Sequence, residues 1–373
     1  MGPGQTRQQA VLIKDLSRTM ARTALDNWEK IMFDDYFDEL DRRRFLAGSA
    51  AVAGAGLLTG LPSAEALANK FPSRNIKVYV PTREGGGADR NLRAFSSIWK
   101  KYLKVNFEVS FYPGAAGRVG YEKYMGLAKE DGHDLLFGNM GPEVLNWVVK
   151  KPTFNVADLV YFAQMDRDPG IIFVGRKSKF THIDQIVAEG KKRTIQVGVS
   201  RLAHPATLGV LALGRHTGAK FNVIPLSGGK NTRAGVATGE MDCGALPSGG
   251  IARRGKNFRI LAIFDNTNPI PDKIKDAVLV NKHFGMNLPP LIAGARAFGI
   301  KKSVIEKQAH HFKILKDTAN MVFNDPEYRE VLKKTKVPMA LFTKSSSPEE
   351  IAKYVKDITA IGEQYRDLLT GKS

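Results

Sequence analysis

The sequence holds a single cysteine, Cys243, among its 373 residues. One thiol cannot form an internal disulfide, so an oxidising compartment is permitted but not used for cross-linking. We expect Cys243 to act as a small buried hydrophobic residue rather than as a nucleophile. The seven histidines are scattered, and the adjacent His310 and His311 would point to different faces of a helix. The sequence therefore predicts no metal site and no cofactor.

The sequence also lacks the motifs of common enzyme classes. Residues 85–89 do not have the three-glycine pattern of a dinucleotide-binding fold, and residues 229–231 do not have the earlier glycine of a phosphate-binding P-loop. Ser200 lacks the second glycine of a nucleophile elbow. From these absences we predict a protein that is not an enzyme.

Acidic residues are few relative to basic ones. The chain carries 56 Lys and Arg against 37 Asp and Glu, a formal net charge of +19 at pH 7. The basic residues are dispersed, with short local groups only at 253–256 and 333–334, and no platform of alternating aromatic and basic residues is present. The charge therefore favours small anionic molecules or an acidic envelope surface as partners, and not nucleic acid.

Long apolar runs are missing except for one mild run at residues 45–64, which contains four glycines and Pro62. Residues 42–46 read Arg-Arg-Arg-Phe-Leu before it, and Ala-Leu-Ala at 66–68 ends it. This order is typical of an export signal, and the paired arginines resemble the twin-arginine class. A retained membrane anchor is the alternative, which the glycines and the proline disfavour. We predict that residues 1–68 are an N-terminal extension with a cleaved twin-arginine signal and that the mature protein is periplasmic.

The rest of the chain alternates short apolar strands with amphipathic helices, which predicts parallel sheets covered by helices. The clearest predicted strands are 76–80, 105–109, 135–137, 171–174 and 194–199. The helix after the first strand carries its apolar residues three and four apart, on one face: Leu92, Phe95, Trp99 and Leu103.

Two stretches rich in Asp and Pro, 165–170 and 265–290, interrupt this alternation. We interpret them as the places where the chain crosses between two α/β lobes. Lobe 1 would then comprise residues 69–170 plus 290–373, and lobe 2 residues 171–289. Two lobes joined by two crossovers enclose a cleft, and clefts of this kind commonly bind small ligands.

Three loops that contain Gly or Ser precede predicted helices, at residues 83–89, 200–205 and 227–231. Each leaves unpaired backbone N–H groups at a helix N-terminus, where the helix dipole also favours negative charge. Such ends bind carboxylate or phosphate, and glycine allows the ligand to approach the backbone. One such loop would be explained as a tight turn, but three of them on two lobes favour an anion site.

We expect these loops and one strand end to supply the ligand contacts. The predicted ligand-binding residues are Arg83, Gly85, Gly86, Gly87, Asp89, Asn139, Ser200, His204, Ser227 and Gly228. Backbone N–H groups of the loops would hold one carboxylate, and Arg83 or His204 would engage a distal group of the ligand. At Gly86 we expect a positive φ, which favours glycine.

Four motifs occur in the order known from one protein family. They are VPTREGGGAD at residues 80–89, YPGAAG at 112–117, DGHDLL at 131–136 and GEMD at 239–242. From about residue 74 to its end, the chain resembles the substrate-binding receptors of tripartite tricarboxylate transporters, often called Bug receptors. The resemblance implies a periplasmic-binding-protein type II-like α/β fold with two lobes. It also implies a periplasmic receptor that closes around a small organic acid and delivers it to membrane permease subunits. We expect this receptor to be a monomer.

The chain departs from the family pattern where the ligand would lie. Thr82 stands where the family usually has an aromatic residue, and Leu-Ser-Gly at 226–228 replaces the usual Tyr-Lys-Gly. The identity of the carboxylate is therefore left open, as is delivery to a sensor protein instead of a permease. The alternative function is an exported hydrolase or lyase that uses Glu84, Asp89 or His204 as acid or base in the same cleft.

Overall fold

The computed structural model describes residues 71–342 and 348–371. The predicted signal at residues 1–68 lies outside the described residues, so its cleavage and its pathway stay predictions. No helix in the described part of the chain is long and apolar enough to cross a membrane.

The first sheet has five strands in the order β2-β1-β3-β12-β4. Its strands are β1 (Ile76–Val80), β2 (Phe107–Phe111), β3 (Asp134–Asn139), β4 (Leu159–Phe162) and β12 (Arg296–Lys301). β1 pairs in parallel with β2 and β3, whereas β12 runs antiparallel to β3 and β4.

The second sheet has seven strands, with β10-β9-β5-β8-β6-β7 in order and β11 paired to β5. Its strands are β5 (Asp168–Gly175), β6 (Ile195–Val199), β7 (Phe221–Pro225), β8 (Cys243–Pro247), β9 (Phe258–Ile263), β10 (Val278–Leu279) and β11 (Ile292–Gly294). β5 runs antiparallel to β8 and β9. Each sheet is therefore mixed and not parallel as predicted. The antiparallel strands are β5, which follows β4 of the first sheet, and β12, which follows β11 of the second sheet, so each enters its sheet from the other one.

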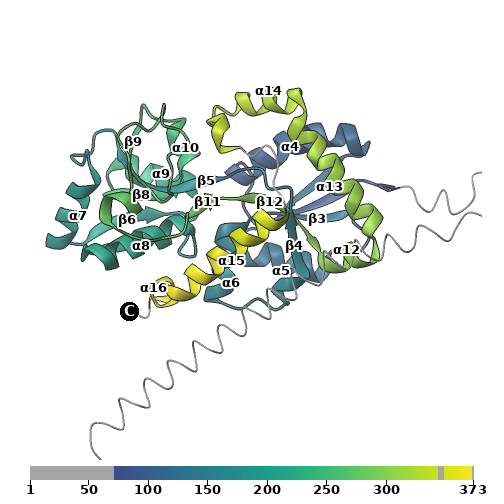
Figure 1. Ribbon diagram of the computed structural model, residues 1–373, viewed down its shortest axis with the longest axis horizontal. Helices are drawn as coiled ribbons and strands as arrows, with labels where there is room; N and C mark the ends of the chain where they lie inside the picture. The colour runs from purple at the N-terminus through teal and green to yellow at the C-terminus, as the bar shows by residue number, and fades with distance from the viewer. Residues whose placement is uncertain (1–70, 343–347, 372–373) are drawn as a thin grey trace, which may run out of the picture. The chain divides into compact units, whose positions relative to one another are not determined.

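Helices lie around both sheets (Figure 1). With the first sheet lie α4 (Gly87–Leu103), α5 (Arg118–Leu127), α6 (Met140–Val149), α12 (Lys302–Lys307), α13 (Ala309–Asn324), α14 (Pro326–Lys334) and α15 (Pro348–Gln364). With the second lie α7 (Ile183–Lys192), α8 (Pro205–Thr217), α9 (Gly229–Thr238), α10 (Ser248–Ala252) and α11 (Val280–Phe284). The last helix, α16 (Arg366–Thr370), contacts both α6 and α8.

The predicted apolar face of α4 is the face that the helix buries. Leu92, Phe95 and Trp99 are fully buried and Leu103 nearly so. The Phe95 ring meets Trp99 edge to face with centroids 5.4 Å apart, a geometry that aromatic pairs favour. Phe298 of β12 lies against both rings, which fixes α4 and hence the glycine loop before it on the first sheet.

The chain passes from one sheet to the other at two places, and the labels β5, β11 and β12 meet near the middle of Figure 1. The first passage leads from β4 to Asp168, where β5 begins; the second lies between Gly294, the end of β11, and Arg296, the start of β12. The two are hydrogen-bonded together, since the Met165 N–H donates to the Arg296 carbonyl at 2.7 Å. The lobe boundaries at 170/171 and 289/290 themselves stay a prediction.

Candidate anion-binding site

The first predicted loop is a turn held by its own side chains. The carboxylate of Asp89 accepts the Gly85 N–H at 2.8 Å and the Arg93 Nε–H at 2.6 Å. Asp89 is buried, and both of these hydrogen bonds join it to nearby residues of the chain, so its carboxylate stabilises the turn itself.

The positive φ of this turn is not where the sequence analysis placed it. Gly85 has φ +72°, whereas Gly86 has φ −77° and ψ −173°, an extended conformation open to any residue. The prediction for Gly86 is therefore wrong, because the reversal of the chain takes place one residue earlier. Gly86 is the N-cap residue of α4. Because glycine has no side chain, no side-chain cap accepts the backbone N–H groups of the first turn of this helix. Arg83 is exposed.

Arg296 lies directly against the start of α4. A Cβ atom added to Gly87 would lie 2.9 Å from Nη2 of Arg296. The Nη1 atom of Arg296 forms an ion pair with Asp166, whose carboxylate also accepts the Arg296 N–H at 2.7 Å and the Asn91 amide at 3.1 Å. A side chain at position 87 would therefore have to displace this guanidinium group.

The second loop ends in an unusual helix cap. The Nδ1 atom of His204 accepts the Ala206 N–H at 3.2 Å at the start of α8. Burial, followed by the charges of Arg201 and Arg296, lowers the pKa of His204 well below its ordinary value, so the ring is neutral. With Nδ1 as the acceptor, the ring proton is on Nε2, which is the one donor His204 could offer to a ligand.

The third loop is joined to the second. The N–H of Gly228 donates to the Ser200 carbonyl at 3.1 Å, so this predicted ligand donor already has a partner. The N–H groups left over at the start of α9 are those of its first turn, from Gly229 onward. Ser227, with φ +55°, is exposed, and the Ser200 hydroxyl has no hydrogen bond to any residue that the structure describes.

The second loop also contacts the first sheet's side. Nη1 of Arg201 donates to the Ala116 carbonyl at 2.7 Å, within the turn that contains the YPGAAG motif. That turn packs on Pro81, just before the first loop, since a Cβ on Gly117 would lie 3.5 Å from the Pro81 Cβ. The starts of α6 and α8 meet too: a Cβ on Gly141 would lie 2.8 Å from Cγ of Pro205. The starts of α6 and α8 thus lie together with the Arg201 loop and the turn after β2.

Asn139 holds this region together instead of reaching outward. Its Nδ2 donates to the Ala293 carbonyl and its Oδ1 accepts the Ala295 N–H, both at 2.9 Å. The side chain is buried, with one bond to Ala293 of β11 and one to Ala295 in the passage between β11 and β12. Asn139 thus links strands of the two sheets, and its contact with a ligand stays a prediction.

Sequence reasoning missed Asp168, the first residue of β5. Its carboxylate accepts the Ser248 hydroxyl at 2.7 Å and the Gly249 N–H at 3.0 Å, at the start of α10. Burial, assisted by the charge of Asp166, raises the pKa of Asp168 to about 6, although these hydrogen bonds act in the opposite direction. The only signal in the sequence was its place in an Asp-rich stretch.

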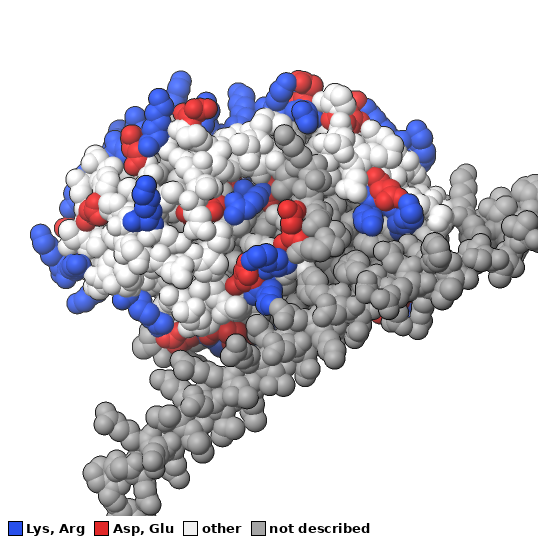
Figure 2. All heavy atoms as spheres, viewed as in Figure 1, with Lys and Arg blue, Asp and Glu red and all other residues white. Residues whose placement is uncertain are grey.

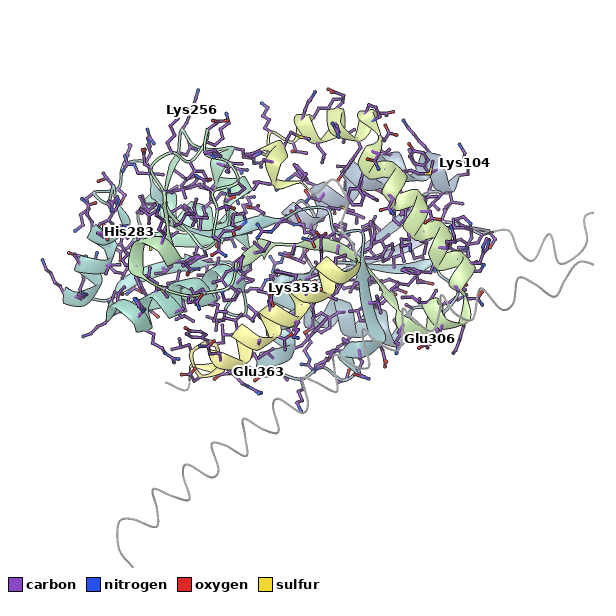
Figure 3. All side chains as sticks on the ribbon, viewed as in Figure 1. Lys104, Lys256, His283, Glu306, Lys353 and Glu363 are labelled. Carbon is purple, nitrogen blue, oxygen red and sulfur yellow. The ribbon has the colours of Figure 1, made fainter. Side chains whose placement is uncertain are left out.

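The described residues include one group of side chains close enough together to hold a metal ion, at α7 and α11. The Asp184 carboxylate lies 2.7 Å from Nδ1 of His182 and 2.8 Å from Nε2 of His283. One ligand atom from each of the three lies within 4.8 Å of the other two, and two imidazoles with a carboxylate suit a divalent cation such as zinc. Figure 3 labels His283 on the outside of the second-sheet half. Spacing along the chain could not reveal it, because His283 is remote from the other two.

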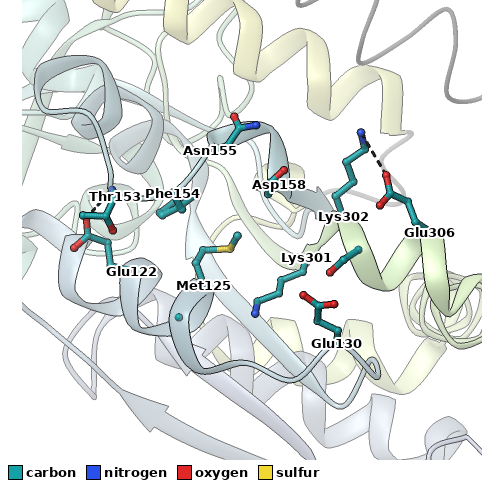
Figure 4. A pocket seen from close by; sticks show the side chains of 12 residues that line it. Glu122, Met125, Glu130, Thr153, Phe154, Asn155, Asp158, Lys301, Lys302 and Glu306 are labelled. Carbon is teal, nitrogen blue, oxygen red and sulfur yellow. Dashed lines mark hydrogen bonds and ion pairs between the residues drawn. The ribbon is translucent and has the colours of Figure 1, made fainter.

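A surface cavity of about 520 Å³ opens beside the first sheet (Figure 4). Its charged lining comprises Glu122, Glu130, Asp158, Glu306, Lys301 and Lys302. None of the three loops contributes to it. Its carboxylates outnumber its lysines, and Lys302 is already paired with Glu306 at 3.5 Å, so its charge does not suit an organic anion.

Neither a protein-family model nor a curated protein matches the sequence, but solved structures resemble the chain. A TctC solute-binding protein from Polaromonas is 18% identical, covers 82% of this chain and 100% of its own, and has a TM-score of 0.62. The periplasmic binding protein BugD is 16% identical, with 80% and 98% covered and a TM-score of 0.64. Rpa4515 of R. palustris with adipate is 17% identical, with 81% and 99% covered and a TM-score of 0.67. These likenesses confirm the predicted fold class: the chain has the two-lobed α/β fold of periplasmic solute-binding proteins.

Proposed function

We propose that the protein is a periplasmic substrate-binding receptor of the tripartite tricarboxylate transporter type. It captures a small organic carboxylate between two lobes, residues 69–170 with 290–373 and residues 171–289, and delivers it to membrane permease subunits. It works as a monomer after export through the twin-arginine pathway. The four ordered sequence motifs, together with the fold, support this assignment.

The observation that carries the proposal is the convergence of helix N-termini. α8 and α9 are joined through the bond from Gly228 to Ser200, and Arg201 reaches the turn that supports the first loop. Backbone N–H groups in such a place solvate a carboxylate without reorganising, because they are already fixed. The ligand contacts we propose are the first turns of α4, α8 and α9, with His204 Nε2 as a neutral donor.

Two of the structures similar in fold are described with small carboxylates. Rpa4515 is described with adipate, and MatC from Rhodopseudomonas palustris, 18% identical with a TM-score of 0.62, with bound malate. By analogy of fold, this supports a carboxylate as the ligand class here.

The acid and base groups of the alternative function, an exported hydrolase or lyase, are engaged elsewhere. Glu84 pairs with Arg93 at 2.7 Å, Asp89 holds the glycine turn, and Nδ1 of His204 caps α8. No two of these three share a hydrogen bond in the described structure, as a general base and its orienting partner would. We therefore propose that the protein binds without chemistry.

Mass spectrometry of what co-purifies with the protein from the native envelope tests the proposal. The bound molecule is released by denaturation and is also incubated with fresh protein. A receptor returns the same small acid in both samples, whereas an enzyme converts it. Recovery of a converted acid would contradict the proposal and favour the hydrolase or lyase. A pull-down from the same membranes separates a permease partner from a sensor protein.

A further inference from the structure

Five arginines gather beside the glycine loops, and the proposed function does not yet use them. We call Arg90, Arg233, Arg253, Arg254 and Arg296 the arginine cluster. Arg90 comes from α4, Arg233 from α9, Arg253 and Arg254 follow α10, and Arg296 begins β12. All five side chains belong to residues that are only partly exposed. The cluster thus draws on elements of both sheets.

Two arginines of the cluster stand at the first loop. Nη1 of Arg90 donates to the Gly85 carbonyl at 2.9 Å, and Nη2 of Arg296 lies against Gly87. Their guanidinium groups therefore flank the same turn whose backbone opens α4.

Two others stand at the third loop and the start of α10. A Cβ on Gly229 would lie 3.2 Å from Nη1 of Arg233, and one on Gly250 would lie 3.8 Å from the same atom. Nη1 of Arg254 donates to the Gly250 carbonyl at 2.7 Å. Arg233 and Arg254 are therefore neighbours across Gly250.

The two pairs lie within electrostatic reach of each other. Burial lowers the pKa of Arg90, and the charges of Arg253, Arg296 and Arg254 lower it further. Burial likewise lowers the pKa of Arg233 to about 10, assisted by the charges of Arg254, Arg253 and Arg90. Like charges that depress one another's pKa in partly buried positions oppose the approach of the elements that carry them.

The cluster has little compensating negative charge. Arg296 pairs with Asp166, but Arg90, Arg253 and Arg254 donate to the backbone carbonyls of Gly85, Thr335 and Gly250. Among the described residues, Arg233 has no hydrogen bond, and Asp89 beside Arg90 is held by Arg93. The face drawn in Figure 2 shows Lys and Arg as well as Asp and Glu, scattered among uncharged residues. A partly desolvated positive charge without an anionic partner is unfavourable, so an anion bound at the cluster would lower its free energy.

We propose that the arginine cluster, centred on Arg90 and Arg233, is a second anion subsite that binds the distal acid groups of the ligand. The inference rests on the proposed function: helix N-termini take one carboxylate, and the cluster takes the rest. Four guanidinium groups outside the Asp166 pair match more than one additional charge, because each fork binds a carboxylate or phosphate edge-on. The ligand class is a small organic acid with three or more negative charges, either a polycarboxylate or a phosphorylated acid.

Calorimetric titration of the full chain, freed of bound ligand by denaturation and refolding, tests the subsite. The probes are tricarballylate with three carboxylates, 3-phosphoglycerate with a phosphate, and butyrate with one carboxylate. We expect both polyanions to bind ~10-fold or more tightly than butyrate, with a steeper loss of affinity as salt is added. Whichever polyanion binds better identifies the phosphate or the carboxylate source, and either order supports the subsite.

Single variants assign the effect to the cluster. Arg233→Gln and Arg90→Gln should each weaken the tighter polyanion ~10-fold or more. Arg233→Gln should change butyrate affinity less than about twofold, whereas Arg90→Gln also loses the bond to the Gly85 carbonyl of the first loop and is therefore judged on the polyanion preference alone. The matched control is Arg176→Gln, an exposed arginine just beyond the opposite end of β5 that makes the same change of charge. It should leave both affinities unchanged. Thermal melting of each variant shows whether it is folded. If one variant does not fold, the salt dependence of polyanion binding to the wild-type protein still tests the subsite.

The outcomes separate the subsite from the receptor. If the wild-type chain binds butyrate as tightly as the polyanions, or if both variants keep the polyanion preference, the subsite is wrong although the receptor stands. If no organic acid binds the wild-type chain at all, the proposed function itself fails.

Discussion

Arg201 and Ala116 join the two halves of the protein. Arg201 lies in the loop after β6 of the second sheet, and Ala116 lies in the turn after β2 of the first sheet. Nη1 of Arg201 donates to the Ala116 carbonyl at 2.7 Å. Burial lowers the pKa of this arginine, while Glu143 and Tyr121 act in the opposite direction. Because this guanidinium group belongs to the second-sheet half and binds a carbonyl of the first-sheet half, it is placed to hold the two halves together around a ligand.

Arg201→Gln should therefore weaken ligand binding. Glutamine is shorter and uncharged, so the bond to the Ala116 carbonyl is lost and one positive charge leaves the site. We expect the dissociation constant of the best-binding acid to rise ~10-fold, the size expected for one hydrogen bond of a charged group. Calorimetry measures it beside Arg215→Gln, whose arginine pairs with Asp367 away from the loops. Equal affinities for wild-type and Arg201→Gln would show that the bond is incidental.

Gly120→Ala should destabilise the protein although alanine favours helices. The added Cβ would lie 2.5 Å from Cα of Pro81, a backbone atom that cannot step aside without moving the first loop. Overpacking of this kind costs ~1–3 kcal/mol of unfolding free energy, and the ligand should also bind less tightly. Gly126→Ala, in the same helix α5, is the control, since a Cβ there meets nothing within 4 Å. Urea unfolding decides: equal losses in both variants would contradict the packing argument.

Asp168 should make stability fall with rising pH. Its folded pKa of about 6 is above the ordinary value of 3.8 for an aspartate, so its proton is held more tightly in the folded state. Its contribution is complete below pH ~4 and is lost as the pH rises through about 6, by up to ~3 kcal/mol for a shift of this size. Asp168→Asn keeps an acceptor for Ser248 and Gly249 but has no proton to lose.

The measurement is the unfolding free energy of the wild-type chain and of Asp168→Asn, taken by urea titration at pH 4, 5, 6 and 7. The wild-type value minus the variant value should fall across this range. Asp272→Asn, an exposed aspartate, should give no such trend. Parallel pH curves for wild-type and Asp168→Asn would contradict the assigned shift.

Export can be tested apart from binding. Replacing Arg42 and Arg43 together by lysine should leave unprocessed precursor in the cytoplasm, because the twin-arginine pathway reads guanidinium pairs and not charge alone. Arg44→Lys alone keeps the first pair and serves as the control. Fractionation and immunoblotting provide the readout. Normal processing of the double variant would rule out this pathway but not export.

Local parts of the fold could be predicted because their signals are local. β1 spans residues 76–80 as expected, and the predicted strand 194–199 corresponds to β6, Ile195–Val199. The buried face of α4 followed from spacing alone. Strand direction did not follow, since β5 and β12 run antiparallel to β8 and β3, which are distant from them in sequence.

The candidate site could be predicted only as backbone. Loops that begin helices are visible in sequence, whereas the partners of Asn139 at Ala293 and Ala295 are more than a hundred residues away. The same distance hid the arginine cluster, because Arg90 and Arg233 come from helices of different sheets. Gly86 was assigned the φ of Gly85, since two neighbouring glycines give no indication of which one reverses the chain.

Binding of a small carboxylate to the ligand-free full chain is the central claim, and a melting-temperature screen tests it most directly. The panel holds mono-, di- and tricarboxylates beside sugars, nucleotides and DNA. At a hundred times its dissociation constant, the correct acid should add about 2.7 kcal/mol and raise the melting temperature by several degrees. Sugars, nucleotides and DNA should leave it unchanged. If no organic acid in a broad panel raises the melting temperature, the account of this protein as a carboxylate receptor is contradicted.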